Sequence, residues 1–553
     1  MFRARFRPWI GFGGFLIPCR GPPAPPFPHE PLLSPEYFRA GLGSLIEPTK
    51  DQPNFPHLRD MVSSTKGYYA RDYSVWLGWN NMRYIIEGSA LHARLLNRTL
   101  VIPSYVFVRS CESQRPACEG FATMIDRDEL SINRDGDEQE DEHPPPHQMG
   151  WLIPIEVMVD LANMRKHVPV LTISQYLTLN GLSTDLETRN GLWDRINYHS
   201  STVNRTSPSL AVVPNKEFDH DLELLRVDTL PENLATSPKL DAHASRIHDD
   251  ILYQMKLSRT IGMEDVSGYL HKATGERWGQ SDLHEMSTIL AKYGLAPVHT
   301  FAGLPAEFSK AVNNPVTEAA PIELMRGFAN DFARYTEDVL LVEGEIHSNR
   351  KPGFMAFASA EARDAYQNLV LKGIVHPPAI QALANAVADH MIAMNCGRAW
   401  MAAHWRRGDF VELGWNHNRS SHEGVDMLRS RLKSGRETLK SLKAEAKGRP
   451  THPLPLPHDR WYLATDERNP DALAYARSKN AVLFSDVLAS IPALRRLVGW
   501  PLLFTDVIAL VEQEVMARSD FFFGYAFSSV AGGVVNIRAG RGMDPRAMLL
   551  DGT

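Results

Sequence analysis

The stretch from Ala399 to Phe410, AWMAAHWRRGDF, constrains the fold of this chain more than any other. Its first half, Ala399 to Trp405, is apolar without helical spacing, which predicts a buried strand. Two adjacent arginines, Arg406 and Arg407, and a glycine follow at once, a pattern that suits the binding of an anion. In an open α/β sheet, ligands gather at the carboxyl ends of strands. The stretch therefore predicts a site at the end of a parallel strand, and a structural pair with Asp409 holding Arg407 is the alternative.

Strands and helices alternate on both sides of this stretch. After a helix at 379–394, the apolar pattern predicts strands at 461–465, 481–484 and 521–523 and a helix at 505–518. This alternation indicates a parallel sheet covered by helices.

The amino-terminal part shows the same order. Residues 68–77 are rich in β-forming side chains and end at Gly78, after which Asn80 or Asn81 is predicted to cap a helix. A strand at 99–102 follows. Strand, glycine turn, helix and strand open a nucleotide-type α/β domain.

The segment HWRRGDF resembles the His-x-Arg-Arg-Gly-Asp box of the GDP-fucose protein O-fucosyltransferase family, particularly the branch that modifies thrombospondin-type repeats. Two further stretches carry the resemblance, 78–103 and 512–538, in the order that the family uses, whereas 105–390 match only weakly. The resemblance implies an α/β, GT-B-like fold with two Rossmann-like domains facing a cleft. It also implies an inverting, metal-independent transfer of fucose from GDP-fucose to a Ser or Thr hydroxyl of a protein acceptor.

The length of 553 residues is too great for one core, so two domains with insertions are predicted. We expect a signal-like, proline-rich and disordered stem at 1–66. A Rossmann-like domain with insertions, on the acceptor side, is expected at 67–370, and a second one that binds the GDP-sugar at 371–553.

Arg406 is the predicted catalytic cation. Negative charge builds up on the diphosphate as the sugar leaves, so a fixed cation there lowers the barrier. A metal held by a DxD pair is the usual alternative, but the close acidic spacings, at 126–128 and 135–137, lie in an acidic loop away from any strand end. No metal and no other cofactor are therefore expected.

The resemblance also implies a set of residues that bind the donor. A carboxylate accepts hydrogen bonds from the N1–H and amino group of guanine, and Glu512, followed by Gln513, matches the acidic residue of the family. The segment Ser528, Ser529 and Val530, predicted to lie in a loop after the strand at 521–523, matches a Ser-Thr-Phe that holds phosphate and base, although valine removes an aromatic contact. Asp466 is expected to contact the ribose or buttress Arg406, and the remaining residues, His404 and Asp409, to orient the arginines.

The general base is missing from its family position. A glutamate precedes the Gly-Phe-Asn that corresponds to Gly78, Trp79 and Asn80, but here the position holds Leu77. Leucine cannot take a proton, so either another group serves or none is needed. We expect Asn80 to hold the acceptor or the sugar, and Glu87, about 10 Å further along the helix, to lie too far away.

Two hypotheses for the function remain, an enzyme and a binding domain. The first is the fucosyltransferase, with transfer of another GDP-sugar as a variant of it. The second is a catalytically silent domain that binds a GDP-sugar or a glycoprotein, which Leu77 and Val530 favour.

Bulk properties narrow the choice of partners. A net charge of −6 argues against nucleic acid. Of the four cysteines, Cys111 and Cys118 either close a small disulfide or stay free thiols.

Three arginines precede a nine-residue apolar run at 9–17, which suits a degenerate signal sequence or a mispredicted start and is too short to span a bilayer. The resemblance implies the secretory pathway (endoplasmic reticulum or Golgi), where the three N-x-Ser/Thr sequons permit glycosylation, with membrane contact only through an N-terminal anchor.

Overall fold

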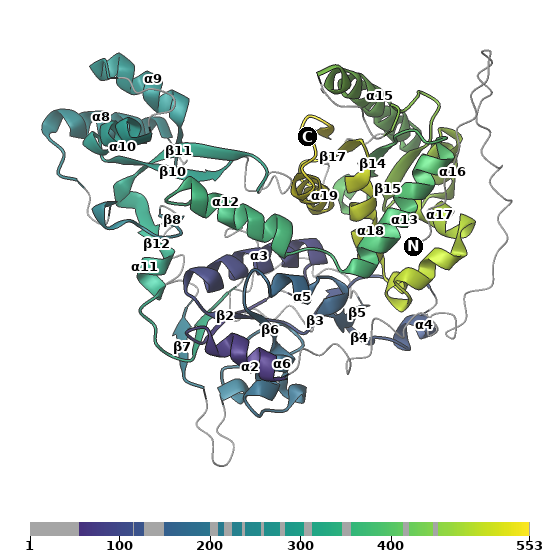
Figure 1. The fold of residues 1–553 in the computed structure, drawn as a ribbon, viewed down its shortest axis with the longest axis horizontal. Helices are drawn as coiled ribbons and strands as arrows, with labels where there is room; N and C mark the ends of the chain where they lie inside the picture. Colours follow the sequence, from purple (N-terminus) through teal and green to yellow (C-terminus); the bar gives the residue numbers. More distant parts are fainter. Residues whose placement is uncertain are drawn as a thin grey trace, which may run out of the picture.

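A computed structural model describes residues 55–551, apart from Ser74, Gln114, 127–148, 200–207, 215–223, 235–237, 256–258, 277–282, 303–311, 345–354, 413–419 and 446–451. The fold is mixed α/β, built around two five-stranded parallel sheets (Figure 1). We call the parts that carry the first and second sheets the N-half and the C-half.

The sheet of the N-half is parallel throughout and is buried. Its order is β6-β2-β1-β13-β7. Each strand is short and apolar, as expected for strands covered on both faces. The strands are β1 (Tyr68–Arg71), β2 (Thr99–Ile102), β6 (Val170–Thr172), β7 (Leu210–Val213) and β13 (Val339–Val342).

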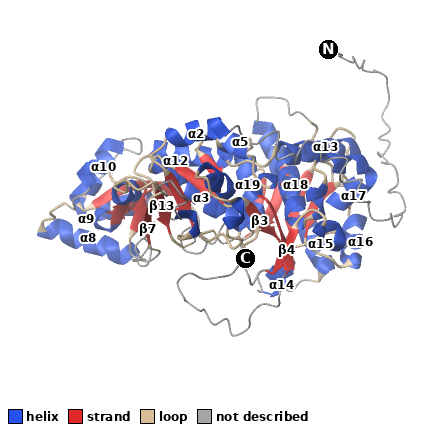
Figure 2. Ribbon diagram, turned by 90° about the horizontal axis from the view of Figure 1, so that it is seen from below, coloured by secondary structure: helices blue, strands red, loops and turns tan. Residues whose placement is uncertain are grey.

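The sheet of the C-half has the Rossmann order. Its strands run β16-β15-β14-β17-β18, which is 3-2-1-4-5 in chain order, with every pair parallel. Helices cover it on both sides (Figure 2). The strands are β14 (Met401–Trp405), β15 (Trp461–Thr465), β16 (Ala481–Val482), β17 (Phe521–Tyr525) and β18 (Met548–Asp551). The main helices are α13 (Pro378–Met394), α15 (Ser421–Glu445), α16 (Pro470–Ser478), α17 (Phe484–Ser490), α18 (Thr505–Arg518) and α19 (Ser529–Gly540).

Two antiparallel insertions extend the N-half. The first projects at the end of the molecule remote from the C-half (Figure 1) and has a core of its own. It contains α8 (Ala242–Met255), α9 (Met263–Thr274) and α10 (Leu283–Lys292) with the sheet of β9 (Ile261–Gly262), β10 (Leu295–Phe301) and β11 (Pro315–Pro321). The second is the sheet of β3 (Tyr105–Val108), β4 (Thr123–Asp126) and β5 (Met149–Pro154). Other elements are α2 (Phe55–Ser63), α4 (Arg115–Glu119), α5 (Leu161–Met164), α6 (Ile173–Leu179), β8 (Leu225–Val227), β12 (Met325–Gly327), α11 (Phe328–Phe332), α12 (Ala360–Asn368) and α14 (Gly408–Glu412).

One hydrophobic core runs through both halves. The first long helix of the N-half, α3 (Trp79–Leu95), contributes to it together with α13, α18 and α19 of the C-half. Helix α19 packs directly on α3. The two sheets are therefore joined by a buried apolar junction rather than by the chain connection alone.

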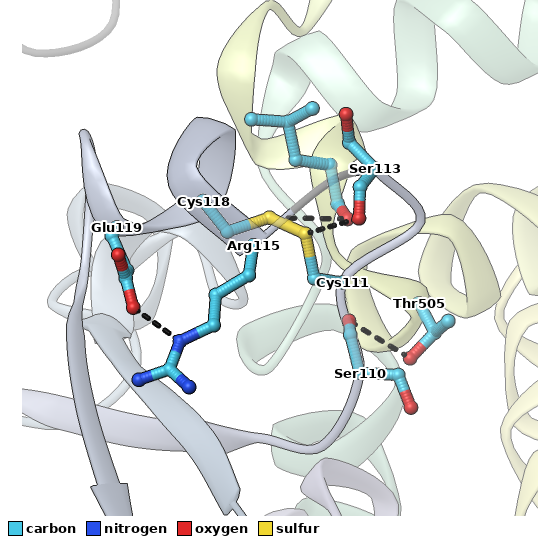
Figure 3. The surroundings of a disulfide bond; sticks show 8 residues. Ser110, Cys111, Ser113, Arg115, Cys118, Glu119 and Thr505 are labelled. Atoms are coloured by element: carbon cyan, nitrogen blue, oxygen red, sulfur yellow. Dashed lines mark hydrogen bonds and ion pairs between the residues drawn. A yellow bond between two sulfur atoms is a disulfide. The ribbon is translucent and has the colours of Figure 1, made fainter.

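Residues 109–112, here called the strap, fasten the N-half to the beginning of α18. The amide of Glu112 donates to the carbonyl of Leu503 at 2.7 Å, and the amide of Thr505 donates to the carbonyl of Ser110 at 3.1 Å. The strap ends in a disulfide between Cys111 and Cys118 (Figure 3), which confirms the first of the two alternatives for these cysteines.

Most of the predicted elements are present, with differences at their ends. The strands at 461–465 and the helix at 505–518 match β15 and α18 at both ends. Strand β1 stops at Arg71 instead of reaching Leu77, because the chain leaves the sheet where Asp72 bonds to loop amides. Strand β17 runs past Gly524 to Tyr525, since β18 pairs with it that far. Every strand of the first sheet precedes residue 343, and every strand of the second follows residue 400.

Several predictions fall outside the described residues. They are the part of the predicted stem at 1–54, the acidic loop from 127 onward, and the sequons at Asn204 and Asn418. The disorder predicted for the whole stem at 1–66 is wrong at its end, because Phe55–Ser63 form helix α2 and Leu58 packs in a buried cluster. Within the described ranges, no helix is long and apolar enough to cross a membrane.

Helix α15 supplies a test of how the second sheet is covered. Its buried face includes Gly435, where an added methyl group would lie 2.4 Å from the ring of the buried Phe521. We expect Gly435→Ala to lower the free energy of unfolding by about 1–3 kcal/mol, the usual cost of overpacking, despite the better helix propensity of alanine.

Urea denaturation of Gly435→Ala measures this loss. Ser434→Ala is the matched control, because Ser434 is an exposed neighbour in the same helix and should change stability by less than about 0.5 kcal/mol. Equal stability of the two variants would contradict the packing of α15 on β17.

Candidate functional site

The candidate site lies where the strand order of the C-half reverses, between β14 and β17. Crevices at such switch points are where open α/β sheets bind ligands. The carboxyl end of β14 presents His404, whose Nδ1 lies 3.5 Å from Oγ of Ser528 beyond the end of β17. Ser528 is the N-cap of α19, so the first amides of a 12-residue helix face this place.

The segment at 528–530 therefore differs from the sequence prediction. We predicted a loop after the strand, but Ser529 and Val530 are the first two residues of α19. Ser528 caps the helix by accepting a hydrogen bond from the amide of Ala531. The cause is a common one, because a serine at this position satisfies an amide that the first turn leaves unpaired.

The carboxylate of Asp466 organises the arginine box. It follows the neighbouring strand β15, and its Oδ2 lies 2.8 Å from Nη1 of Arg406, so the predicted contact with Arg406 is present. Its Oδ1 accepts a hydrogen bond of 2.7 Å from the amide of Arg407. A methyl group at Gly408 would lie 2.6 Å from Oδ2. Glycine is therefore required here to admit the carboxylate that orients Arg406.

The second arginine of the box forms an ion pair with a glutamate. Nε of Arg407 lies 3.2 Å from the carboxylate of Glu467, and its guanidinium lies over the ring of Trp405. The alternative pairing of Arg407 with Asp409 stays a prediction, because Asp409 lies in α14 with a side chain that is not among the described ones. Arg407 thus has a bond to the residue after Asp466 and a ring beneath it.

Burial keeps His404 uncharged. The side chain is 5% exposed, and this burial, with the nearby charge of Arg406, lowers the pKa of His404 to about 3. A neutral imidazole adds no positive charge to the site and can accept or donate one hydrogen bond at each nitrogen. This state suits the predicted orienting role, which remains a prediction.

Glu512 lies half-buried on α18, near the end of β15. The hydroxyl of Tyr462 donates to its Oε1 at 3.4 Å. Burial, together with the charges of Glu112 and Asp466, raises the pKa of Glu512 to about 8, although the hydrogen bond from Tyr462 opposes this shift. The carboxyl group is therefore mostly protonated at neutral pH.

A buried amide ties the two halves together beside Glu512. Nε2 of Gln513 donates to Oδ1 of Asn80 at 2.8 Å and to the carbonyl of Val530 at 3.1 Å. Gly533 leaves room for this amide, since a methyl group there would lie 2.4 Å from Nε2. Asn80 and Val530, which we predicted separately, are thus brought to one place by a third residue.

The beginning of α3 differs from the prediction. The helix starts at Trp79 with Gly78 as its N-cap, so Asn80 and Asn81 are inside the first turn rather than capping it. Trp79 is buried, and its indole nitrogen has no partner among the described residues. Asn80 is free of the capping role because Gly78 already turns the chain into the helix, which leaves its side chain to contact Gln513.

The acid that we considered as a distant base is not accessible. Glu87 is fully buried and pairs with Nε of Arg83 at 2.9 Å. Burial raises the pKa of Glu87 to about 7. Leu77 is also buried. Neither residue offers a carboxylate to an acceptor hydroxyl in this arrangement.

In the part of the chain that the structure describes, no three His, Cys, Asp or Glu side chains gather in a way that could hold a metal ion. The charged groups that are present suit a phosphate and a hydrogen-bonding base. Several functional candidates escaped the sequence analysis, namely Tyr462, Glu467, Arg109 and Glu112. Glu467 carried a signal, since it follows a predicted strand end, but the others contact the site only through folding.

Comparison with known proteins gives no match to a protein-family profile or to a curated protein. Solved structures with a similar fold include POFUT1 in complex with GDP-fucose, at 12% identity and a TM-score of 0.35, covering 88% of this chain and 98% of that one. Another is the NodZ alpha-1,6-fucosyltransferase soaked with GDP-fucose, at 11% identity and a TM-score of 0.29, with 85% of this chain and 91% of that one covered. The fucosyltransferase NodZ from Bradyrhizobium has 12% identity and a TM-score of 0.28, covering 85% and 90%. Scores this low carry no residue role and no activity to this chain.

The raised pKa of Glu512 predicts a pH-dependent stability. The folded state holds a proton up to about pH 8, whereas an unfolded glutamate loses it near pH 4.3. The stability that the neutral group contributes is thus present below about pH 4 and lost as the pH rises towards 8. Glu512→Gln keeps a neutral side chain, so its melting temperature relative to wild type should rise steadily from pH 5 to 8.

The control is Glu437→Gln, at an exposed residue of α15 whose pKa is lowered by Lys440. Its carboxylate is ionised in both states above pH 5, so its difference from wild type should stay constant over this window. Parallel pH curves for Glu512→Gln and wild type would show that Glu512 is ionised in the fold.

Proposed function

We propose that the chain is a glycosyltransferase that uses GDP-fucose and transfers fucose to a Ser or Thr hydroxyl of a protein, with inversion and without a metal. The observation that supports it most is the pairing of Arg406 with Asp466 at the switch point of a Rossmann-ordered sheet. Arg406 lies within the HWRRGDF segment, which resembles the arginine box of the O-fucosyltransferases.

The donor is proposed to lie along the carboxyl edge of the C-half sheet. Guanine would sit at Glu512, whose ionised carboxylate accepts from N1–H and the amino group. The diphosphate would lie between Arg406 and the first turn of α19, where a helix N-terminus and a guanidinium both favour negative charge. Asp466 keeps the guanidinium of Arg406 in place.

Arg406 would act on charge that develops during the reaction. The acceptor oxygen bonds to the anomeric carbon while the bond from that carbon to the β-phosphate oxygen breaks, and the electron pair leaves with GDP. A guanidinium already fixed by a carboxylate needs no reorganisation when this charge appears. The hydroxyl proton would pass to the departing diphosphate, because position 77 holds Leu77, which is buried and apolar and cannot accept it.

The same observation supports a second candidate. A silent domain that binds a GDP-sugar would keep the arginine box and Glu512 while lacking a base. Leu77 in the core and Glu87 locked on Arg83 favour this reading. The two candidates share donor binding and differ in turnover.

Nucleotide binding tests the part common to both candidates. We expect calorimetry to show GDP binding that EDTA leaves unchanged, and Glu512→Gln to weaken it by about 1–3 kcal/mol through an unmatched amide donor. Binding of ADP or UDP should be weak and unaffected by the variant. Loss of GDP binding on chelation, or equal losses for all nucleotides, would contradict the proposed donor site.

Turnover tests the role of Arg406. Lysine keeps the charge but loses the planar fork. We therefore expect Arg406→Lys to lower kcat for GDP-fucose hydrolysis or transfer by about 10²–10³, the range for removing an oxyanion-hole donor, with a much smaller change in KM.

Arg407→Lys is the matched control, because its side chain bonds to Glu467 and lies over Trp405. Arg407→Lys should lower the melting temperature clearly and change kcat little. The opposite pattern would assign the catalytic role to Arg407, and donor binding without any turnover in the wild type would favour the silent domain.

A further inference from the structure

Arg109 of the strap lies against the start of α3, and the carboxylate of Asp506 is close enough to interact with its charge without forming an ion pair. It follows β3 in the N-half, in a region with no recognisable motif. Among the described residues, its half-buried guanidinium forms no ion pair, and its buried Nε has no hydrogen-bond partner. A partly desolvated cation left in this way is costly unless something else binds it.

The position of this guanidinium is set from two sides. The main-chain amide of Arg109 donates to Oδ2 of Asp506, in the first turn of α18, at 2.9 Å. The tip of the side chain lies on the backbone of Gly78, where an added methyl group would be 3.2 Å from Nη2. Glycine at this N-cap therefore gives the guanidinium room at the beginning of α3.

Contacts made by residues that follow Gly78 and Arg109 in the chain place Arg109 near Glu512. Two residues after Gly78, Asn80 bonds to Gln513, which is adjacent to Glu512. Three residues after Arg109, Glu112 is close enough to raise the pKa of Glu512, as Asp466 does. Glu112 also pairs with Arg468 at 2.8 Å, two residues beyond Asp466. The strap and the arginine box thus border the same group.

We propose that Arg109 binds the diphosphate of the GDP-sugar from the N-half, opposite Arg406 of the C-half. This inference rests on the proposed function, since it assumes that a nucleoside diphosphate is the ligand. The guanidinium fork matches two phosphate oxygens and would gain in the complex the partners that it lacks in the empty site. A donor held by both halves would also keep the junction closed around it.

Binding of guanosine, GMP and GDP to wild type and Arg109→Gln tests the proposal by calorimetry. We expect the variant to bind GDP about tenfold or more weakly, because a charge-assisted hydrogen bond is lost, and to bind guanosine as wild type does. The loss for GMP should be smaller than the loss for GDP. A merely structural role would instead reduce all three affinities together.

The matched control is Arg115→Gln. Arg115 is an exposed residue of α4, inside the disulfide loop, and pairs only with Glu119 among the described side chains. Removing a surface pair of this kind changes stability little, so GDP affinity should stay within about twofold of wild type.

A second measurement needs no variant. Phenylglyoxal modifies accessible arginines, and peptide mass spectrometry reads the modification of Arg109 in the wild-type protein. We expect GDP, but not guanosine, to protect it. If the wild type binds GDP while Arg109→Gln binds it equally well, or GDP gives no protection, the assignment of Arg109 is wrong and the donor site stands. If the wild type binds no GDP, the proposed function itself is wrong.

Discussion

The ion pair between Arg406 and Asp466 is the interaction on which the rest of the site depends. It joins the ends of two neighbouring parallel strands, and the same carboxylate also holds the amide of Arg407. A side chain at Gly408 would displace the Oδ2 atom that contacts Arg406. At roughly a quarter exposed on each side, the pair is partly shielded from water, so it fixes geometry more than it adds stability. What it provides is a guanidinium held in one orientation at the point where the sheet order reverses.

The electrostatics around this pair are arranged by burial. His404 is kept neutral on one side of it, and Glu512 is kept protonated on the other, both because their charged forms are poorly solvated. In the empty protein the edge therefore carries the charge of the arginines and little opposing charge from Glu512. Under the proposed function, guanine would bind to the carboxylate of Glu512 only after the proton has left, so donor binding and deprotonation would be linked.

Local signals predicted the parts of the fold that depend on neighbours in sequence. The strand before HWRRGDF, β15 and α18 were recognisable because apolar runs end in clear polar or glycine breaks. The contact of Asp466 with Arg406 followed from a rule about parallel sheets, since both residues stand at strand ends. Local patterns did not predict that Ser528 is the N-cap of α19; the sequence prediction placed it in a loop.

The remaining site residues depend on contacts that no local pattern encodes. Gln513 meets Asn80 across 433 positions in the chain, and Arg109 reaches Gly78 only because the strap bonds to the start of α18. Such contacts arise when the two halves pack on a shared core. The sequence resemblance pointed to residues of the C-half because its motifs lie there, and their roles stay predictions. It did not point to the strap, because the middle of the chain carries no motif.

Proton release on GDP binding tests the central claim, that the half-buried carboxyl of Glu512 receives guanine beside the fixed arginine. Calorimetry at pH 7 in two buffers with different ionisation enthalpies counts the protons released per nucleotide. With a pKa of about 8 in the empty site, the account predicts release of close to one proton by wild type and none by Glu512→Gln. Equal proton release by the two proteins would show that Glu512 does not bind guanine, and would contradict the account.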